Sequence, residues 1–224
     1  MPEMTAAIAG STAMLQIGDP APNFRARTTM GVKNLSDFRG RWLVLFSHPA
    51  DFTPVCTSEF VALARASDRF NALGCDLLAV SVDSLYSHLA WIKAIRESFD
   101  VTVSFPIVED PSLVIGRAYG MISDRSPDAA TMRSTYFIDP EGTVRAMISY
   151  PATVGRSVEE MLRVLAALQR IDIDNVVTPE GWHPGDDVLL PPYQDQASLI
   201  GGMDDPRWFC RIRPDRKGGD SDGG

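Results

Sequence analysis

Two short and largely apolar segments in the first half of the chain each predict a strand that is buried on both faces. Residues 42–46 are wholly apolar, and residues 75–82 are apolar apart from Asp76 and Ser81. Apolar segments of this length are typical of sheet strands covered by helices. A shorter strand is expected within 103–108. Later, the β-rich segments 135–138 and 143–148 flank the turn sequence Asp139–Gly142, which predicts an antiparallel hairpin.

Four segments between and after these runs have the periodicity or composition of helices. Residues 54–73 are rich in helix formers, and a shorter helix is expected at 113–119. In 84–99 the apolar residues recur every three or four positions, which predicts a buried face made of Leu85, Leu89, Ile92 and Ile95. Ser157–Glu160 has a capping-box pattern and begins a helix that continues to about Ile171. Strands alternating with helices predict an α/β fold, with a central mixed sheet flanked by helices.

The composition changes near Asp174, where prolines, glycines and acidic residues become frequent. The 224 residues suffice for one full core and a second small module. We therefore predict a flexible lead at 1–14, a main domain at 15–173, a small loop-rich C-terminal domain at 174–214 and a disordered tail at 215–224.

Charge and cysteine count exclude several classes of protein. With 21 basic and 29 acidic residues the net charge is −8, which argues against a general nucleic-acid binder or a binder of anionic membranes. No apolar run approaches the roughly 20 residues that span a bilayer. The first residues lack the basic start of a secretory signal, so we expect a cytoplasmic protein. Three cysteines, an odd number, do not make a disulfide scaffold.

The segment from His48 to Phe60 lies between a predicted strand and a predicted helix, and it contains a cysteine. Thr53 is a good N-cap residue and Pro54 a favoured first helical residue, so Cys56 falls in the first turn. Unpaired backbone N–H groups and the helix dipole favour an anion there, and a thiolate is such an anion. The alternative is that Cys56 is a small buried apolar residue. Its position at a helix start favours the nucleophile.

The pattern Pro49-x-x-x-Thr53-x-x-Cys56 resembles the active-site signature of the peroxiredoxins, which are thiol peroxidases on a thioredoxin fold. Further similar words are Ser81–Ser84, Met132–Asp139 and Tyr150–Arg156. The similarity runs from about residue 15 to 214. His48 and the extended tail resemble the subgroup that uses one cysteine and carries an extra C-terminal domain.

The resemblance implies a thioredoxin-like fold and a thiol-dependent peroxidase that reduces hydrogen peroxide and small alkyl hydroperoxides. In this scheme the Cys56 thiolate attacks the peroxide and becomes a sulfenic acid. Thr53 offers its hydroxyl, Pro49 shields the site from water, and Arg133 holds the thiolate and stabilises charge on the departing oxygen. Without the resemblance, Arg133 reads as an exposed charge at the start of a strand.

The resemblance also extends to residues around this centre. Glu59 is expected to orient an arginine, and Arg156 to lie nearby as a second arginine. For His48 two interpretations stay open, namely a hydrogen bond near the peroxide pocket or a satisfied histidine at a strand end.

The other cysteines determine the subtype. Cys75 begins an apolar strand, so we expect it to pack in the core. Thr178 stands where two-cysteine relatives carry a resolving cysteine, which argues against their common cycle. Cys210 could resolve Cys56 from a neighbouring subunit, helped by flanking arginines, or could merely pack beside Trp208 and Phe209.

The implied partners are a hydroperoxide substrate and an external thiol or other reductant of unknown identity. The resemblance also implies a homodimer whose tail reaches the partner's site, or a decamer of five dimers. An oligomeric chaperone or redox sensor on the same fold is the alternative function. We expect no metal or nucleotide cofactor, because the three histidines lack ligand spacing and no phosphate-binding glycine loop is present.

Overall fold

The computed structural model describes residues 14–122, 130–202 and 206–215. Residues 1–13 of the predicted lead and 216–224 of the predicted tail lie outside the described residues. The chain divides into two compact units, Met1–Val158 and Glu159–Gly224, and each is described by itself. The boundary predicted at Asp174 falls inside the second unit and stays a prediction.

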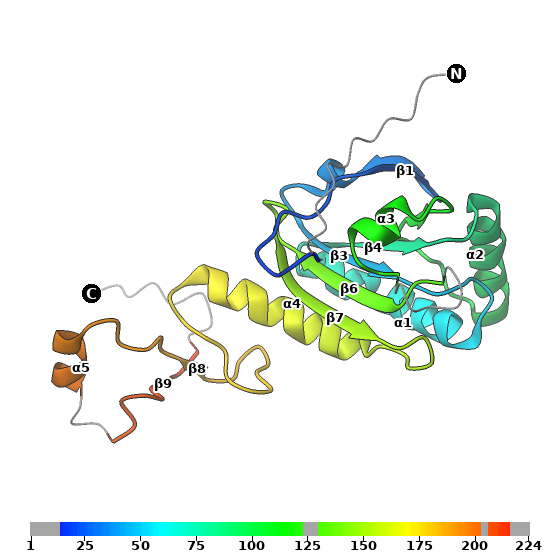
Figure 1. Cartoon of the computed structure of the whole chain (residues 1–224). Helices are drawn as coiled ribbons and strands as arrows, with labels where there is room; N and C mark the ends of the chain where they lie inside the picture. Colours follow the sequence, from blue (N-terminus) through cyan, green and yellow to red (C-terminus); the bar gives the residue numbers. More distant parts are fainter. Residues whose placement is uncertain (1–13, 123–129, 203–205, 216–224) are drawn as a thin grey trace. The chain divides into compact units, whose positions relative to one another are not determined.

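The first unit is built on a seven-stranded sheet (Figure 1), whose strand order is β2-β1-β5-β4-β3-β6-β7. The parallel neighbours are β3 with β4 and β4 with β5, and the other pairs are antiparallel, which confirms the predicted mixed sheet. The central β3 is buried along its whole length, as its apolar run predicts. The strands are β1 (Arg25–Thr28), β2 (Gly31–Asn34), β3 (Trp42–Ser47), β4 (Cys75–Ser81), β5 (Ile107–Glu109), β6 (Arg133–Ile138) and β7 (Val144–Tyr150).

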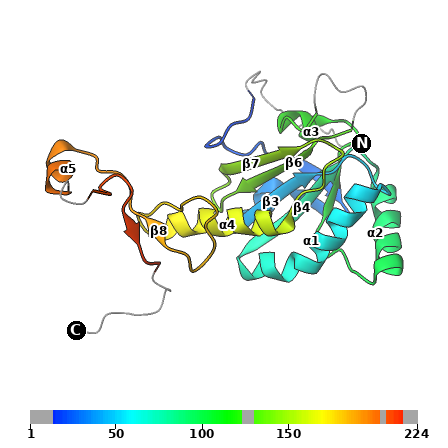
Figure 2. The ribbon, with the colours of Figure 1, turned by 90° about the horizontal axis from the view of Figure 1, so that it is seen from below.

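Two long helices cover one face of this sheet, α1 (Pro54–Ala72) and α2 (Leu85–Phe99). The ring of Phe46 on β3 lies 5.8 Å from that of Phe60 on α1, which in turn lies 4.5 Å from Trp91 on α2. Figure 2 shows α1 and α2 neighbouring each other below the sheet, with α3 (Val114–Ala118) on its other side. The predicted helices at 54–73, 84–99 and 113–119 are therefore confirmed.

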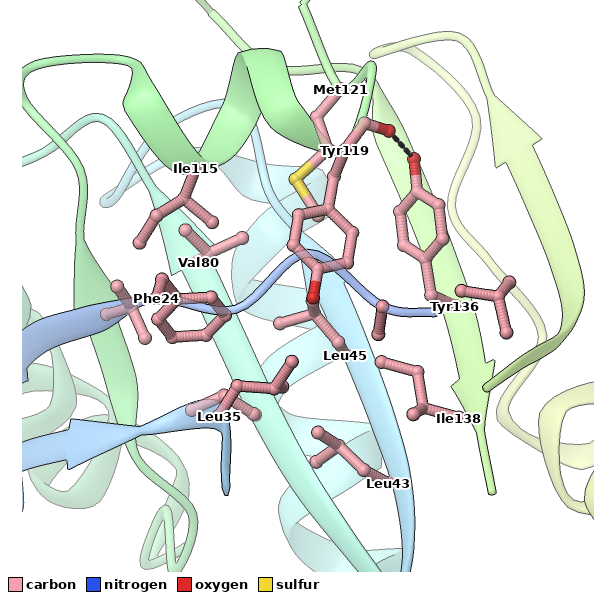
Figure 3. Packing of buried hydrophobic residues seen from close by; sticks show 14 residues of the cluster. Phe24, Leu35, Leu43, Leu45, Val80, Ile115, Tyr119, Met121, Tyr136 and Ile138 are labelled. Atoms are coloured by element: carbon pink, nitrogen blue, oxygen red, sulfur yellow. Dashed lines mark hydrogen bonds between the residues drawn. The ribbon is translucent and has the colours of Figure 1, made fainter. Parts of the chain in front are cut away.

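The opposite face of the sheet holds an apolar cluster around Tyr119 (Figure 3). Its ring meets Phe24 at 6.3 Å and Tyr136 at 5.2 Å, both edge to face. The Tyr136 hydroxyl donates to the carbonyl of Tyr119, and the Tyr119 hydroxyl donates to the Pro22 carbonyl at 2.9 Å. Successive side chains of β3 point to opposite faces of the sheet, since Leu43 and Leu45 belong to this cluster while Phe46 faces the helices.

Two features of this unit differ from the sequence prediction. The β1–β2 hairpin and the 3₁₀ helix after it (η1, Leu35–Phe38) were not predicted, because their polar residues mask the strand pattern. On α2 the buried residues are His88, Trp91 and Ile95, whereas Leu89 is 40% exposed. Ile95 is buried as predicted, and Leu85 and Ile92 are half-buried. The prediction was wrong at Leu89, because the neighbouring His88, with its buried hydrogen-bond partner, takes the interior position.

Helix α4 (Val158–Ile173) begins directly after Ser157, the predicted capping residue, and from Glu159 on it belongs to the second unit. The rest of the second unit is mostly loop. Trp182 packs with Val176 and Val188 against alanines of α4. Arg170 ties the segment together by binding Asp174 at 2.5 Å and Asp215 at 2.7 Å. The remaining elements are β8 (Val188–Leu189), α5 (Gln196–Gly202) and β9 (Ile212–Arg213), with β8 and β9 paired antiparallel.

Across the described ranges of both units, no helix is both long and apolar enough to cross a bilayer.

Candidate active site

The start of α1 places the predicted nucleophile. The chain leaves β3 at Ser47, turns through residues 48–53 and enters the helix at Pro54. Thr53 is the N-cap residue, with an extended backbone, and the amide of Thr57 makes the first helical hydrogen bond to its carbonyl at 2.9 Å. The Thr53 hydroxyl donates to the Ala50 carbonyl at 2.8 Å and does not cap the helix with its side chain. Cys56 is therefore the third helical residue, as predicted, among amides that precede the first helical bond.

Cys56 is fully buried and lies beside a guanidinium group. Nη1 of Arg133 donates to its sulfur across 3.4 Å. Arg133 begins β6 and is only 2% exposed, so the interpretation as a solvent-exposed strand-start charge is wrong. The Nε and Nη2 groups of Arg133 donate to the Ala152 carbonyl at 2.9 and 2.7 Å, which fixes the plane of the guanidinium.

Glu59, one helical turn after Cys56, bridges two arginines. Its Oε2 accepts from Arg133 Nη1 at 2.8 Å and from Arg156 Nη2 at 2.8 Å, and its Oε1 accepts from Arg156 Nε at 2.9 Å. Burial alone would raise the pKa of Glu59, but the hydrogen bonds and charge of Arg156, with the charge of Arg133, hold it below its ordinary value. Two guanidinium groups and one carboxylate leave one positive charge, which a thiolate at Cys56 would neutralise.

Arg156 is held on several sides. Its backbone N–H donates to Glu59 Oε1 at 2.7 Å, and its Nη1 donates to the Ser134 carbonyl at 3.1 Å. The guanidinium carbon lies 5.2 Å from the centre of the Phe46 ring, within cation–π range. The structure thus brings together Cys56, Glu59, Arg133 and Arg156, although Cys56 and Arg156 are 100 positions apart in the sequence.

A second buried polar cluster lies where the loop leaves β3. His48 Nε2 lies 2.9 Å from Asp51 Oδ1, and His88 Nδ1 lies 2.8 Å from Asp51 Oδ2. Both histidines are fully buried, and burial lowers the pKa of His48 below its ordinary value. Although burial alone would raise the pKa of Asp51, hydrogen bonds from the two histidines hold it well below its usual range.

The sequence analysis missed the roles of Asp51 and His88, which lie 37 positions apart. Their ligand-type atoms and that of His48 all lie within 4.8 Å of one another, so these three residues form a cluster that could hold a metal ion. The only signal in the sequence was a histidine on a helix that follows a buried strand.

The remaining predicted residues are placed as follows. Pro49 is buried in the loop directly after His48. Cys75 is buried in β4, and burial raises the pKa of its thiol to about 12, which keeps it protonated and fits a packing role. Cys210 is exposed and belongs to the second unit.

Comparisons with known proteins agree with this arrangement. Residues 17–147 match the model of the AhpC/TSA family, and residues 167–204 match that of the C-terminal domain of 1-Cys peroxiredoxin. A peroxiredoxin of Aquifex aeolicus is 47% identical over 87% of this chain and 94% of its own length. A peroxiredoxin of Methanosarcina mazei is 40% identical over 89% of this chain and 97% of its own length.

Solved structures give the same result. The yeast mitochondrial 1-Cys peroxiredoxin has a TM-score of 0.76 and 43% identity, covering 80% of this chain and 88% of its own. Peroxiredoxin 6 of Arenicola marina has a TM-score of 0.76 and 32% identity, covering 84% and 88%. With a buried cysteine at a helix start, an arginine on its sulfur and these relatives, the chain belongs to the peroxiredoxins and is a thiol-dependent peroxidase.

Proposed function

We propose that Cys56 is the residue that reacts with the substrates, which are hydrogen peroxide and small alkyl hydroperoxides. The contact of Arg133 Nη1 with the Cys56 sulfur at 3.4 Å carries this proposal. The guanidinium of Arg133 is permanently charged and lies at the sulfur, where it can stabilise a thiolate, the nucleophilic form of a cysteine.

The reaction is a two-electron transfer to the peroxide. The Cys56 thiolate attacks one peroxide oxygen, a sulfur–oxygen bond forms and the oxygen–oxygen bond breaks. The departing hydroxide or alkoxide takes a proton and leaves as water or an alcohol, while Cys56 becomes a sulfenic acid. Arg133 is positioned to stabilise the negative charge as it moves from sulfur to the departing oxygen.

Thr53 and Pro49 complete the proposed site. Because the Thr53 hydroxyl donates its hydrogen to Ala50, its oxygen retains lone pairs that can accept a hydrogen bond from the peroxide. Pro49 has no N–H and is buried in the loop, which suits the exclusion of water. Glu59 orients Arg133 through the 2.8 Å contact, and Arg156 holds Glu59 in turn.

We infer that an external thiol returns Cys56 to its reduced form. One thiol condenses with the sulfenic acid to give a mixed disulfide and water, and a second thiol cleaves that disulfide. The similarity to a 1-Cys peroxiredoxin whose thiol resolution was studied with glutathione and thioredoxin supports this class of reductant. Resolution by Cys210 is the competing route, and the exposure of that thiol keeps it chemically available.

Two experiments test the proposal. The Cys56→Ser substitution should abolish hydrogen peroxide consumption, whereas the matched Cys75→Ser protein should retain it. Full turnover by the Cys56 variant would refute the assignment.

Intact mass under non-reducing conditions after one equivalent of peroxide distinguishes reduction by an external thiol from resolution by Cys210. A monomer that has gained oxygen supports the external reductant, and a dimer linked through Cys56 and Cys210 supports the two-cysteine cycle.

We further propose a homodimer, or a decamer of five dimers, in the cytoplasm. Residues 167–204 match the C-terminal domain of 1-Cys peroxiredoxin, and the resemblance to that subgroup implies that this tail serves a dimer. Three free cysteines suit a reducing compartment. Neither the site nor the relatives favour the chaperone or redox-sensor alternative over the peroxidase. Sedimentation of the reduced and the oxidised protein would determine the assembly.

A further inference from the structure

The buried cluster of His48, Asp51 and His88 lies outside the group that contacts the Cys56 sulfur, and its chemistry is constrained by its hydrogen bonds. The two histidine nitrogens that face away from Asp51, His48 Nδ1 and His88 Nε2, are buried without a partner among the described residues. Asp51 is an ionised carboxylate and can only accept hydrogen bonds. The hydrogens of both imidazoles must therefore lie on the nitrogens that face it, His48 Nε2 and His88 Nδ1.

This arrangement of hydrogens disfavours a metal ion. A metal held by the three facing atoms would need both imidazole hydrogens on the outward nitrogens, where the described structure offers no acceptor. Metal-bound histidines almost always donate their other N–H to a partner. The cluster is consequently a carboxylate that accepts one hydrogen bond from each of two imidazole rings.

The gripped carboxylate belongs to the loop that leads into the Cys56 helix. The backbone N–H of Asp51 donates to Asp83 Oδ2 at 2.8 Å, so the residue is tied through both its main chain and its side chain. The next residue, Phe52, has a φ of 57° and is 58% exposed. A bulky residue in this left-handed region is strained by about 1–3 kcal/mol and keeps that conformation only when its surroundings impose it. Thr53 follows at once as the N-cap of α1.

The same face of α2 makes a second contact near Cys56. Trp91, one turn beyond His88, donates its indole N–H to the Thr57 hydroxyl at 3.2 Å, and Thr57 follows Cys56 directly. Thus α2 contacts the chain on both sides of the nucleophile, through His88 at Asp51 and through Trp91 at Thr57. These two contacts explain why α2 buries a histidine in place of one of its leucines.

We propose that His88, acting through Asp51, is a positioning residue for the peroxide reaction, since it holds the strained loop that sets Thr53 and the first turn of α1 around Cys56. The inference rests on the proposed role of Cys56. A misplacement of reacting groups by about 1 Å can cost on the order of 100-fold in rate. Loss of the His88 hydrogen bond should therefore slow the reaction with peroxide more than it changes simple thiol reactivity.

The test compares two substitutions of one residue. His88→Leu keeps the bulk and removes the donor, whereas His88→Asn keeps an N–H close to the position of Nδ1. For each protein two rate constants of Cys56 are measured, oxidation by hydrogen peroxide and alkylation by iodoacetamide followed at that residue by mass spectrometry. Tyr86→Leu, an exposed change on the same helix, is the control.

We expect His88→Leu to lower the peroxide rate constant by about 10- to 100-fold while alkylation stays within about threefold, and His88→Asn to restore most of the peroxide rate. An unchanged peroxide rate in His88→Leu, or a parallel change in both rates, would overturn the inference. Failure of the wild-type protein to oxidise Cys56 at all would instead overturn the proposed function.

A measurement on the unaltered protein covers the case in which His88→Leu does not fold. Nitrogen-15 NMR of the histidine side chains should show the hydrogen of His88 on Nδ1 and that of His48 on Nε2 at neutral pH. The opposite tautomers, or loss of both N–H signals on adding zinc, would refute the hydrogen-bonded clamp.

Discussion

The substitution Glu59→Gln tests how the buried charges around Cys56 are balanced. Glu59 accepts one hydrogen bond from Arg133 and three from Arg156. Among the described residues it is the one acidic group in contact with either guanidinium. The change keeps the shape of the side chain and removes its charge. It also introduces an amide N–H₂ that must face a guanidinium donor.

The expected loss of stability is large, because all three side chains are almost wholly excluded from solvent. Removing one partner of a buried ion pair leaves an uncompensated charge and typically costs about 3–5 kcal/mol. Here one carboxylate serves two cations, so we expect the upper half of that range, about 4–5 kcal/mol near neutral pH.

The stability that ionised Glu59 contributes should depend on pH, in a direction set by its pKa shift. The pKa of Glu59 is lower in the folded protein than its ordinary value of 4.5, so the ionised form is favoured by folding. This contribution is fully present above that value and is lost as the pH falls through the folded pKa. The difference in stability between wild type and variant should therefore be constant from about pH 7 to about pH 5 and should shrink below about pH 4.

Urea unfolding of both reduced proteins, followed by circular dichroism, measures the difference at each pH. Glu97→Gln is the matched control, since Glu97 forms an exposed pair with Lys93 on α2 and should cost no more than about 0.5 kcal/mol. A loss below about 1 kcal/mol for Glu59→Gln would show that the two arginines do not depend on this carboxylate.

Three further predictions concern other buried groups. In the native protein at about pH 8, iodoacetamide should label Cys210 and leave Cys75 unmodified until urea is added, since the pKa of Cys75 is raised to about 12; mass spectrometry of peptides would detect the contrary result. Because the pKa of His48 is lowered on folding, the unfolded chain binds more protons below about pH 6.5, so stability should decrease as the pH falls from there. The slope should flatten in His48→Gln, and an identical slope in urea titrations would contradict the assignment. Tyr136→Phe removes the donor to the Tyr119 carbonyl and should cost about 1–3 kcal/mol in the same assay, with an unchanged midpoint as the refuting result.

Local patterns in the sequence were sufficient for the central part of the fold. The apolar run of β3, the hairpin turn after β6 and the position of Cys56 in the first turn of α1 depend on neighbouring residues, and all were predicted correctly. The β1–β2 hairpin was missed because its four-residue strands are mostly polar and it pairs with β5 far along the chain. Short edge strands of this kind are defined by tertiary pairing more than by their own pattern.

The site residues divide in the same way. The positions of Thr53 and Cys56 at a helix start could be predicted from neighbouring residues. The roles expected for Pro49 and Arg133 came only from the resemblance, since a strand-start arginine is ordinarily exposed. The Asp51–His88 contact was not predictable, because hydrophobic periodicity treats a buried histidine as a polar position and places it toward solvent. Its burial depends on a carboxylate 37 positions away.

The two buried clusters lie near the end of β3, and together they hold the loop and the helix start that position Cys56, the proposed nucleophile. Arg156 stacks on the ring of Phe46 and binds Glu59, which fixes the first turns of α1 from one side. His48, two residues after Phe46, forms a hydrogen bond with Asp51 and so stabilises the loop before α1. Each cluster contains a carboxylate whose charge is satisfied only when its partners from distant strands or helices are in place. The geometry around Cys56 therefore depends on the sheet together with both helices. A substitution that disrupts either cluster should displace Cys56, because only the segments 51–56 and 56–59 separate the cysteine from the two carboxylates.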